Sequence, residues 1–270
     1  MMPLNSTTAG DGWWCAWCAW EATVAELREL SADRLQDMAT AGAEVREVYR
    51  LLAKSGDNIV AEVLRGQGEF YEWDHYPKGD VYDPETHCQY YYHAHPASLR
   101  GGEHGHFHTF LRPKGMPPTV RPAPLDDVVA PAGDNDALSH LIAISMDQYG
   151  YPIRLFSTNR WVTGETWYAA DDVIQMLDRF DMDLAYPSLP VNIWITAMVR
   201  LFRPEIETLL RGRDRTVARW RQRRRVDNPF EDRDLEITSH VEIAVDRQIA
   251  RVEDALATIS RTSGAPSAPG

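Results

Sequence analysis

Histidines are concentrated in one part of this 270-residue chain, and their spacing restricts the local structure that can carry them. Seven of the nine histidines lie between His75 and His108. Five of these form an HxH set from His93 to His95 and an HxHxH set that begins at His104. Side chains two residues apart on a β-strand point to the same face of the sheet, roughly 6.6–7 Å apart. Both sets therefore predict strands with one histidine-bearing face.

A segment containing proline and glycine separates the two sets, so we expect an antiparallel hairpin whose register decides where the imidazoles point. If the residue numbers of each opposing pair add up to an odd number, as for His93 with His106 and His95 with His104, all five imidazoles lie on one face of the sheet. An even sum, such as His95 opposite Glu103, divides them between the two faces. We predict the odd register, because crowded neutral imidazoles are best satisfied by a metal ion and by acceptors that orient them.

The two sets predict a metal site, and the five candidate ligands are His93, His95, His104, His106 and His108. Imidazole ligands suit iron, copper, zinc and nickel. We favour iron or copper, and hence an oxidoreductase, because the neighbouring residues are mainly neutral and aromatic, whereas hydrolytic sites more often carry a carboxylate base. The alternatives are a zinc-dependent hydrolase, a non-catalytic metal or haem binder acting as sensor or carrier, and a purely structural role for the histidines.

Residues beside the histidines are candidates for acid–base chemistry and substrate contacts. Tyr92 adjoins the first set and Glu103 the second, and both are candidate catalytic residues. A regular strand would turn Glu103 away from His104, and tyrosines in strands are often packing residues. The loop between the last predicted strand and the next helix is rich in hydrogen-bonding groups, as substrate-contacting loops often are. Its candidate substrate-binding residues are Asn159, Arg160 and Trp161, with packing as the alternative.

Apolar periodicity predicts helices on both sides of the histidine-rich region. The predicted helices are 20–54, as one or two helices, 58–64, 170–180, 191–211 or beyond, kinked or interrupted at Pro204, and 235–259. Two further strands are predicted at 140–146 and 153–156, joined by a turn at Gly150. The expected fold class is α+β, an antiparallel sheet of four or more strands packed with N-terminal and C-terminal helices.

Composition indicates one domain over 13–261, with small and polar ends at 1–12 and 262–270 that we expect to be disordered. The net charge of −12 argues against nucleic acid or an anionic membrane as a partner. No segment approaches the roughly 18 consecutive apolar residues of a membrane span. The start of the chain lacks the features of a secretory signal, and with three cysteines we expect a cytoplasmic protein acting on a small molecule.

Three other motifs carry weaker predictions. Cys15 and Cys18 form a CxxC, which supplies half the ligands of a zinc site. Segment 211–225 contains eight arginines and Trp220; a solvated helix end is favoured over a nucleic-acid contact. A homo-oligomer is a further option, because an aromatic helical face near a chain end often docks to the body or another subunit. The residues of that face are Trp13, Trp17 and Trp20.

Four phrase-like motifs together resemble an uncharacterised bacterial protein family, a domain of unknown function. The motifs are QYYYHAHP, EHGHFHTFLR, HLIAISMD and NRWVTGETWYAADDVI, and the resemblance spans about residues 30 to 215. The stretch WWCAWCAW near the start of the chain is not part of this pattern. The resemblance implies no activity, so the expected chemistry depends on the residues themselves.

Overall fold

A computed structural model describes residues 20–21, 27–96, 101–125 and 133–263 of the chain. Side-chain oxygens of Ser31, Asn58 and Asn159 accept backbone N–H bonds at the starts of α1, α2 and α3, which fixes where these helices begin. The helices are α1 (Ala32–Ser55), α2 (Ile59–Leu64), α3 (Arg160–Thr163), α4 (Ala170–Leu177), α5 (Leu189–Leu201), α6 (Arg203–Arg224) and α7 (Val245–Ser263). The short 3-10 helices are η1 (Leu27–Glu29), η2 (Pro113–Gly115) and η3 (Pro229–Glu231).

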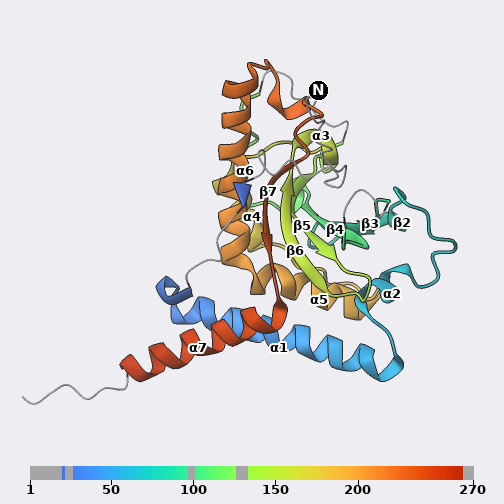
Figure 1. Ribbon diagram of the computed structural model, residues 1–270, viewed down its shortest axis with the longest axis vertical. Helices are drawn as coiled ribbons and strands as arrows, with labels where there is room; N and C mark the ends of the chain where they lie inside the picture. Colours follow the sequence, from blue (N-terminus) through green and yellow to red (C-terminus); the bar gives the residue numbers. More distant parts are fainter. Residues whose placement is uncertain (1–19, 22–26, 97–100, 126–132, 264–270) are drawn as a thin grey trace, which may run out of the picture.

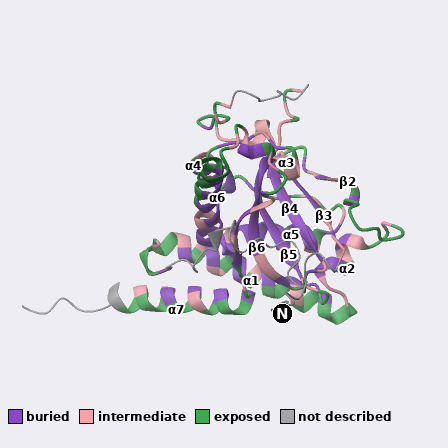
Figure 2. Ribbon diagram, turned by 45° about the horizontal axis from the view of Figure 1, so that its top comes forward, coloured by how far each residue is buried: buried purple, intermediate pink, exposed green. Residues whose placement is uncertain are grey.

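The strands form one sheet in the order β1-β7-β6-β5-β4-β3-β2 (Figure 1). They are β1 (Trp20–Glu21), β2 (Tyr76–Tyr82), β3 (Cys88–His93), β4 (Gly105–Leu111), β5 (Ser139–Met146), β6 (Pro152–Thr158) and β7 (Ile237–Glu242). All neighbours from β7 to β2 are antiparallel, and β1 pairs parallel with β7. The predicted α+β class, with helices from both ends of the chain, is confirmed. Every residue of β4 and β5 is buried, so both faces of the sheet centre are shielded from solvent (Figure 2).

Strand pairing arranges the residues into rungs that cross the sheet, and the residues of one rung share a face. One rung contains Tyr91, His108, Ala143, Phe156 and His240. A second rung, two residues away along each strand, contains His93, His106, Ser145, Arg154 and Glu242. Side chains two residues apart on a strand point the same way, so both rungs lie on one face, which we call the histidine face.

The opposite face of the sheet packs against helices. The hydroxyl of Tyr90 donates to the amide oxygen of Asn192 on α5 at 2.7 Å. The rings of Phe107 and Trp194 lie 5.4 Å apart, and the indole N–H of Trp194 donates to the hydroxyl of Tyr49 on α1 at 3.1 Å. The main apolar core therefore lies between the sheet and α5, with α1 packed on α5. The histidine face is on the other side of the sheet from this core.

Two predicted helices differ from the structure. Segment 235–259 contains β7 before α7, because the β-branched Ile237, Thr238 and Val241 favour a strand that pairs with β6. The predicted helix 20–54 begins at Ala32, and the residues at its expected start form β1 instead. Of the two effects predicted for Pro204, a kink or an interruption, the structure has the interruption, since α5 ends and α6 begins on either side of Phe202.

Several predicted features lie outside the described residues. They are the N-terminal segment 1–12, the tail from 264 onward, Trp13, Trp17, Cys15 and Cys18. Helix α7 continues through Ser263, so the segment expected to be disordered from 262 begins as helix. Among the helices described, none is both long and apolar enough to cross a membrane.

Candidate metal centre

The register of β3 and β4 brings the two histidine sets together. His93 pairs with His106 and Tyr91 with His108, so opposing positions have an odd sum, as predicted. Ala143 and Ser145 are the β5 residues beside His108 and His106 in the same rungs. Their small side chains leave room for imidazoles on the histidine face.

Three imidazoles converge closely enough to hold one ion. His93, His95 and His106 each offer a ring nitrogen, and these nitrogens all lie within 4.8 Å of one another. The Nε2 atoms of His93 and His106 are 2.6 Å apart. His95 follows the end of β3, and its ring lies 4.9 Å from that of His93 and 5.3 Å from that of His106. His106 is buried and the other two are partly exposed, so the cluster reaches the surface on one side.

A buried carboxylate fixes the orientation of His106. One oxygen of Glu103 lies 2.8 Å from Nδ1 of His106, and the other accepts the hydroxyl of Ser145 at 2.5 Å. Because a carboxylate oxygen only accepts, Nδ1 of His106 donates to Glu103, and Nε2 of the same ring faces His93. This carboxylate–histidine arrangement is typical of metal-binding histidines. Glu103 is on the histidine face, which a regular strand would not allow, because β4 begins only at Gly105.

His104 and Tyr92 lie on the other face, away from the three converging imidazoles. The hydroxyl of Tyr92 bonds to Nδ1 of His104 at 2.6 Å, and the His104 ring stacks on Phe70 at 5.6 Å. Burial lowers the pKa of His104. The expectation that all five histidines share one face is therefore wrong for His104, since the regular alternation starts one residue after it. A catalytic role for Tyr92 at the metal would need contact that this position does not provide.

Gly105 is required where β4 begins. A Cβ atom built at this position would lie 2.6 Å from the backbone oxygen of His93 and 2.4 Å from the hydroxyl of Tyr92. We expect Gly105→Ala to push β4 away from β3 and to lower the free energy of unfolding by about 1–3 kcal/mol, measured by urea denaturation. Gly101→Ala is the matched control, because a Cβ atom there has no neighbour within 4 Å. Equal stability of the two variants would contradict the close approach at Gly105.

The histidine cluster continues inward through His108. Nδ1 of His108 lies 3.0 Å from Nε2 of His140, and Nδ1 of His140 lies 3.4 Å from the hydroxyl of Thr158. Burial, aided by the positive charge of Arg213, lowers the pKa of His140 to about 3, so this imidazole is neutral near pH 7. His108 is thus on the histidine face as predicted, 4.8 Å from His106 between ring centres, but His140 already occupies one of its nitrogens.

A second buried carboxylate, Glu165, lies behind this chain of imidazoles. One of its oxygens accepts the backbone N–H of His140 at 2.8 Å, and among the described residues the other has no hydrogen-bond partner. Burial raises the pKa of Glu165 to about 7, against the opposing charge of Arg213. Between pH 4.5 and about 7, the folded protein therefore keeps a proton on Glu165. The unfolded chain, in which this carboxyl has its ordinary pKa of 4.5, has released that proton.

The stability contributed by protonated Glu165 is fully present below pH 4.5 and is lost as the pH rises to about 7. The loss amounts to roughly 3 kcal/mol at most. Glu165→Gln removes this titration while keeping an acceptor for the N–H of His140. We expect the wild type to lose stability relative to the variant between these pH values, measured by urea denaturation at several pH values. Parallel pH profiles would show that Glu165 titrates normally.

Two residues that the sequence did not indicate lie at the exposed side of the cluster. The ring of His75 stacks on Tyr91 at 3.6 Å and lies 5.7 Å from that of His93. The ring of Trp73 meets that of His95 edge-on at 4.3 Å and is 56% exposed. Both precede β2, which pairs with β3, so only the fold brings them to the site. The sole sequence signal was that His75 belongs to the histidine-rich window.

The three predicted substrate-binding residues connect α3 to segment 229–235. The side chains of Asn159 and Trp161 each donate to a backbone oxygen of this segment, at 2.8 and 2.9 Å. Arg160 is buried and donates to a carboxylate oxygen of the same segment at 2.9 Å. These contacts fit the packing alternative, and a role in substrate binding stays a prediction.

Fold and site together define an α+β protein with a histidine-rich centre held between two antiparallel strands. The sequence profile of a domain of unknown function, DUF6969, matches residues 39–243, and the chain belongs to this family. The resemblance seen in the four motifs is thereby confirmed. The match covers His93, His95, His106 and Glu103. A search of curated proteins and a search of solved structures found no match.

Proposed function

We propose that this protein is a metal-dependent enzyme in which His93, His95 and His106 bind one transition-metal ion. We further propose that the metal is iron or copper and that the enzyme is an oxidoreductase acting on a small molecule. The observation that carries the proposal is the pair of Nε2 atoms, 2.6 Å apart, with Glu103 holding the His106 side of the pair.

The spacing of the nitrogens is compatible with a shared ion after a small adjustment. Two imidazole nitrogens bound to one ion at about 2.0–2.1 Å and a tetrahedral angle lie roughly 3.3 Å apart. The observed 2.6 Å between His93 and His106 is shorter, and the widest separation in the group is within 4.8 Å. The close pair must separate by about 0.7 Å, and the widest pair must approach by up to about 1.5 Å. Partly exposed His93 and His95 can make these movements more easily than buried His106, which Glu103 fixes.

We propose that the substrate reaches the metal from the exposed side of the cluster. Three protein ligands leave coordination positions for water or substrate, as catalytic metal sites require. The partly exposed rings of His93 and His95 lie on this side, and the largely exposed ring of Trp73 stands beside His95. A flat aromatic surface next to an open metal position suits a small organic substrate with an apolar part.

The residues around the centre favour redox chemistry over hydrolysis. Both oxygens of Glu103 are engaged, by His106 and by Ser145, so this carboxylate orients a ligand and is not free to act as a base. Two aromatic rings lie close to the imidazoles on the histidine face, with Phe156 5.1 Å from His106 and Tyr91 5.5 Å from His93. Imidazole nitrogens are suitable ligands for iron and copper.

Elemental analysis of the purified protein tests the proposal. We expect about one equivalent of iron or copper in protein isolated from metal-supplemented cells, or after anaerobic reconstitution with Fe(II) or with Cu(II). Bound zinc at one equivalent would overturn the redox assignment and support a hydrolase. Less than about a tenth of an equivalent of any transition metal after reconstitution would overturn the metal site itself. An absorption spectrum distinguishes haem from a non-haem centre.

A further inference from the structure

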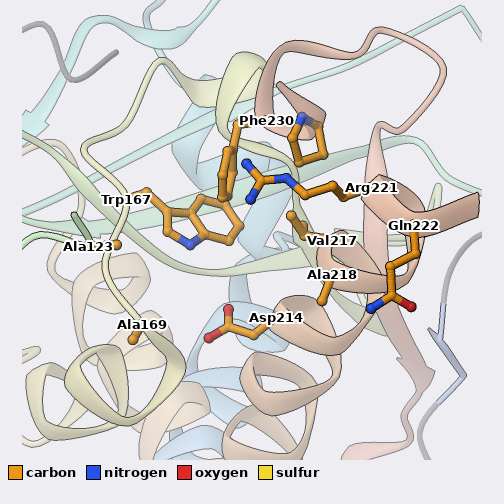
Figure 3. Close-up of a pocket in the computed structure, with 10 residues that line it drawn as sticks. Ala123, Trp167, Ala169, Asp214, Val217, Ala218, Arg221, Gln222 and Phe230 are labelled. Atoms are coloured by element: carbon orange, nitrogen blue, oxygen red, sulfur yellow. The ribbon is translucent and has the colours of Figure 1, made fainter. Parts of the chain in front are cut away.

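A pocket separate from the three converging histidines lies beside α6. Its volume is about 360 Å³, which is within the range of small-molecule sites. Helix α6, the segment before α4, η3 and Ala123 form its walls (Figure 3). It uses none of the three candidate metal ligands, nor Glu103, and so offers a second binding function.

The walls of this pocket are aromatic and apolar. Trp167 and Phe230 form one side, with ring centres 5.0 Å apart at an angle of 62°. Both rings are at least nine-tenths buried and belong to a small apolar cluster with Val217. The remaining apolar surface comes from small side chains, among them Ala169 and Ala218. Rigid rings opposite small residues form a slot suited to a flat ring system.

The charged groups of the pocket leave one positive charge in excess. The carboxylate of Asp214 is neutralised, because Arg213 donates to one oxygen at 2.9 Å and the N–H of Ala170 donates to the other at 2.7 Å. Arg221 makes a long bond of 3.4 Å to the backbone oxygen of Asp227, which uses one of its five N–H donors.

Arg221 is also directed toward the rings. Figure 3 shows its guanidinium reaching from α6 toward Trp167 and Phe230, whereas Gln222 points another way. Among the described residues, Arg221 has no other hydrogen-bond acceptor, and its remaining N–H groups are placed to donate to an anionic group at the mouth of the slot. A guanidinium matches the geometry of a carboxylate and can bind it with two parallel hydrogen bonds.

We infer that this pocket binds a small aromatic carboxylate, with the ring between Trp167, Phe230 and Ala218 and the carboxylate on Arg221. The aromatic walls select a flat ring, and the guanidinium of Arg221, which has no carboxylate partner among the described residues, selects an anion over a neutral analogue of the same shape. The affinity of such a small ligand is in the millimolar to micromolar range.

Ligand-observed NMR titration of the full chain tests this inference, with naphthalene-2-carboxylate and its neutral analogue naphthalene-2-carboxamide as probes. We expect the carboxylate to bind about tenfold more tightly than the carboxamide. Arg221→Gln should abolish this preference. The matched control is Arg223→Gln, an exposed arginine two residues along α6 that does not line the pocket. It should leave both affinities unchanged.

A second variant tests the location without altering charge. Ala218 lines the pocket from an exposed position on α6, so Ala218→Met should fill the slot without disturbing the core and should weaken both probes about tenfold or more. Equal affinities of the two probes for the wild type, or no binding at millimolar concentration, would overturn the inference. Unchanged binding to Ala218→Met, or equal effects of Arg221→Gln and Arg223→Gln, would place the ligand elsewhere and overturn it as well.

Discussion

Replacing His106 by alanine should reduce the bound metal from about one equivalent to less than about a tenth of an equivalent. His106 is the buried member of the three converging imidazoles, and its Nε2 is the one that Glu103 orients toward His93. Without it, His93 and His95 remain as two partly exposed rings from one strand end. Equilibrium dialysis against Fe(II), Cu(II) or Zn(II), followed by elemental analysis, measures the stoichiometry. His93→Ala should have the same effect.

His104→Ala is the matched control for this experiment. The same residue type is removed two positions away, but the His104 ring lies on the opposite face, against Phe70 and Tyr92. Its variant should keep the full equivalent of metal. Retained metal in folded His106→Ala, or lost metal in folded His104→Ala, would show that a different set of histidines binds the ion. Circular dichroism and thermal unfolding confirm that each variant is folded.

Glu103→Gln should weaken metal binding by about 10- to 100-fold without removing it. The amide oxygen of glutamine can still accept the N–H of His106, and its amide nitrogen can bond to Ser145, so the variant keeps the shape of the contact. What it lacks is the negative charge, which strengthens the hydrogen bond and makes the imidazole a better ligand. Competition with a chelator of known affinity measures the change in Kd.

Glu242→Gln provides the control for the charge itself. Glu242 lies in the same rung as His106, but its side chain is largely exposed and pairs with Arg154. Its substitution should change the metal Kd by less than about twofold, because solvent screens an exposed charge. If Glu103→Gln binds metal as tightly as the wild type, Glu103 is a packing residue and does not tune the centre.

Sequence reasoning predicted the elements whose patterns are local. The apolar stripe of α4 and the alternating histidines of β3 and β4 each contain enough information to identify a helix or strand. Strands β1 and β7 were not predicted, because each depends on a neighbour far away in the sequence. Strand β2 was not predicted either, although it pairs with nearby β3, and its pairing register shifts between Tyr76 and Val81. β7 pairs with β6 across about 80 residues, and its β-branched residues fit helical spacing equally well.

The site was predictable to the extent that it depends on strand register. Pairing of His93 with His106 follows from alternation and an antiparallel hairpin, and the structure has that register. The point at which alternation begins could not be read from the sequence, and this displaced His104 and brought Glu103 to the histidine face. Contacts between separate segments, such as His75 on Tyr91, have no local signal at all.

The position of β4 within the sheet gives the centre a kinetic property. His106 lies on a fully buried strand that is paired on both sides, with His93 on one neighbour and Ser145 on the other. Interior strands of this kind open only with a large part of the protein, unlike loops or edges. An ion held between β3 and β4 would bind the paired strands far more tightly than the separated strands. At a free concentration about 100 times its Kd, the ion would add about 2.7 kcal/mol to the free energy of unfolding. Loss of the ion and separation of the strands then become coupled events.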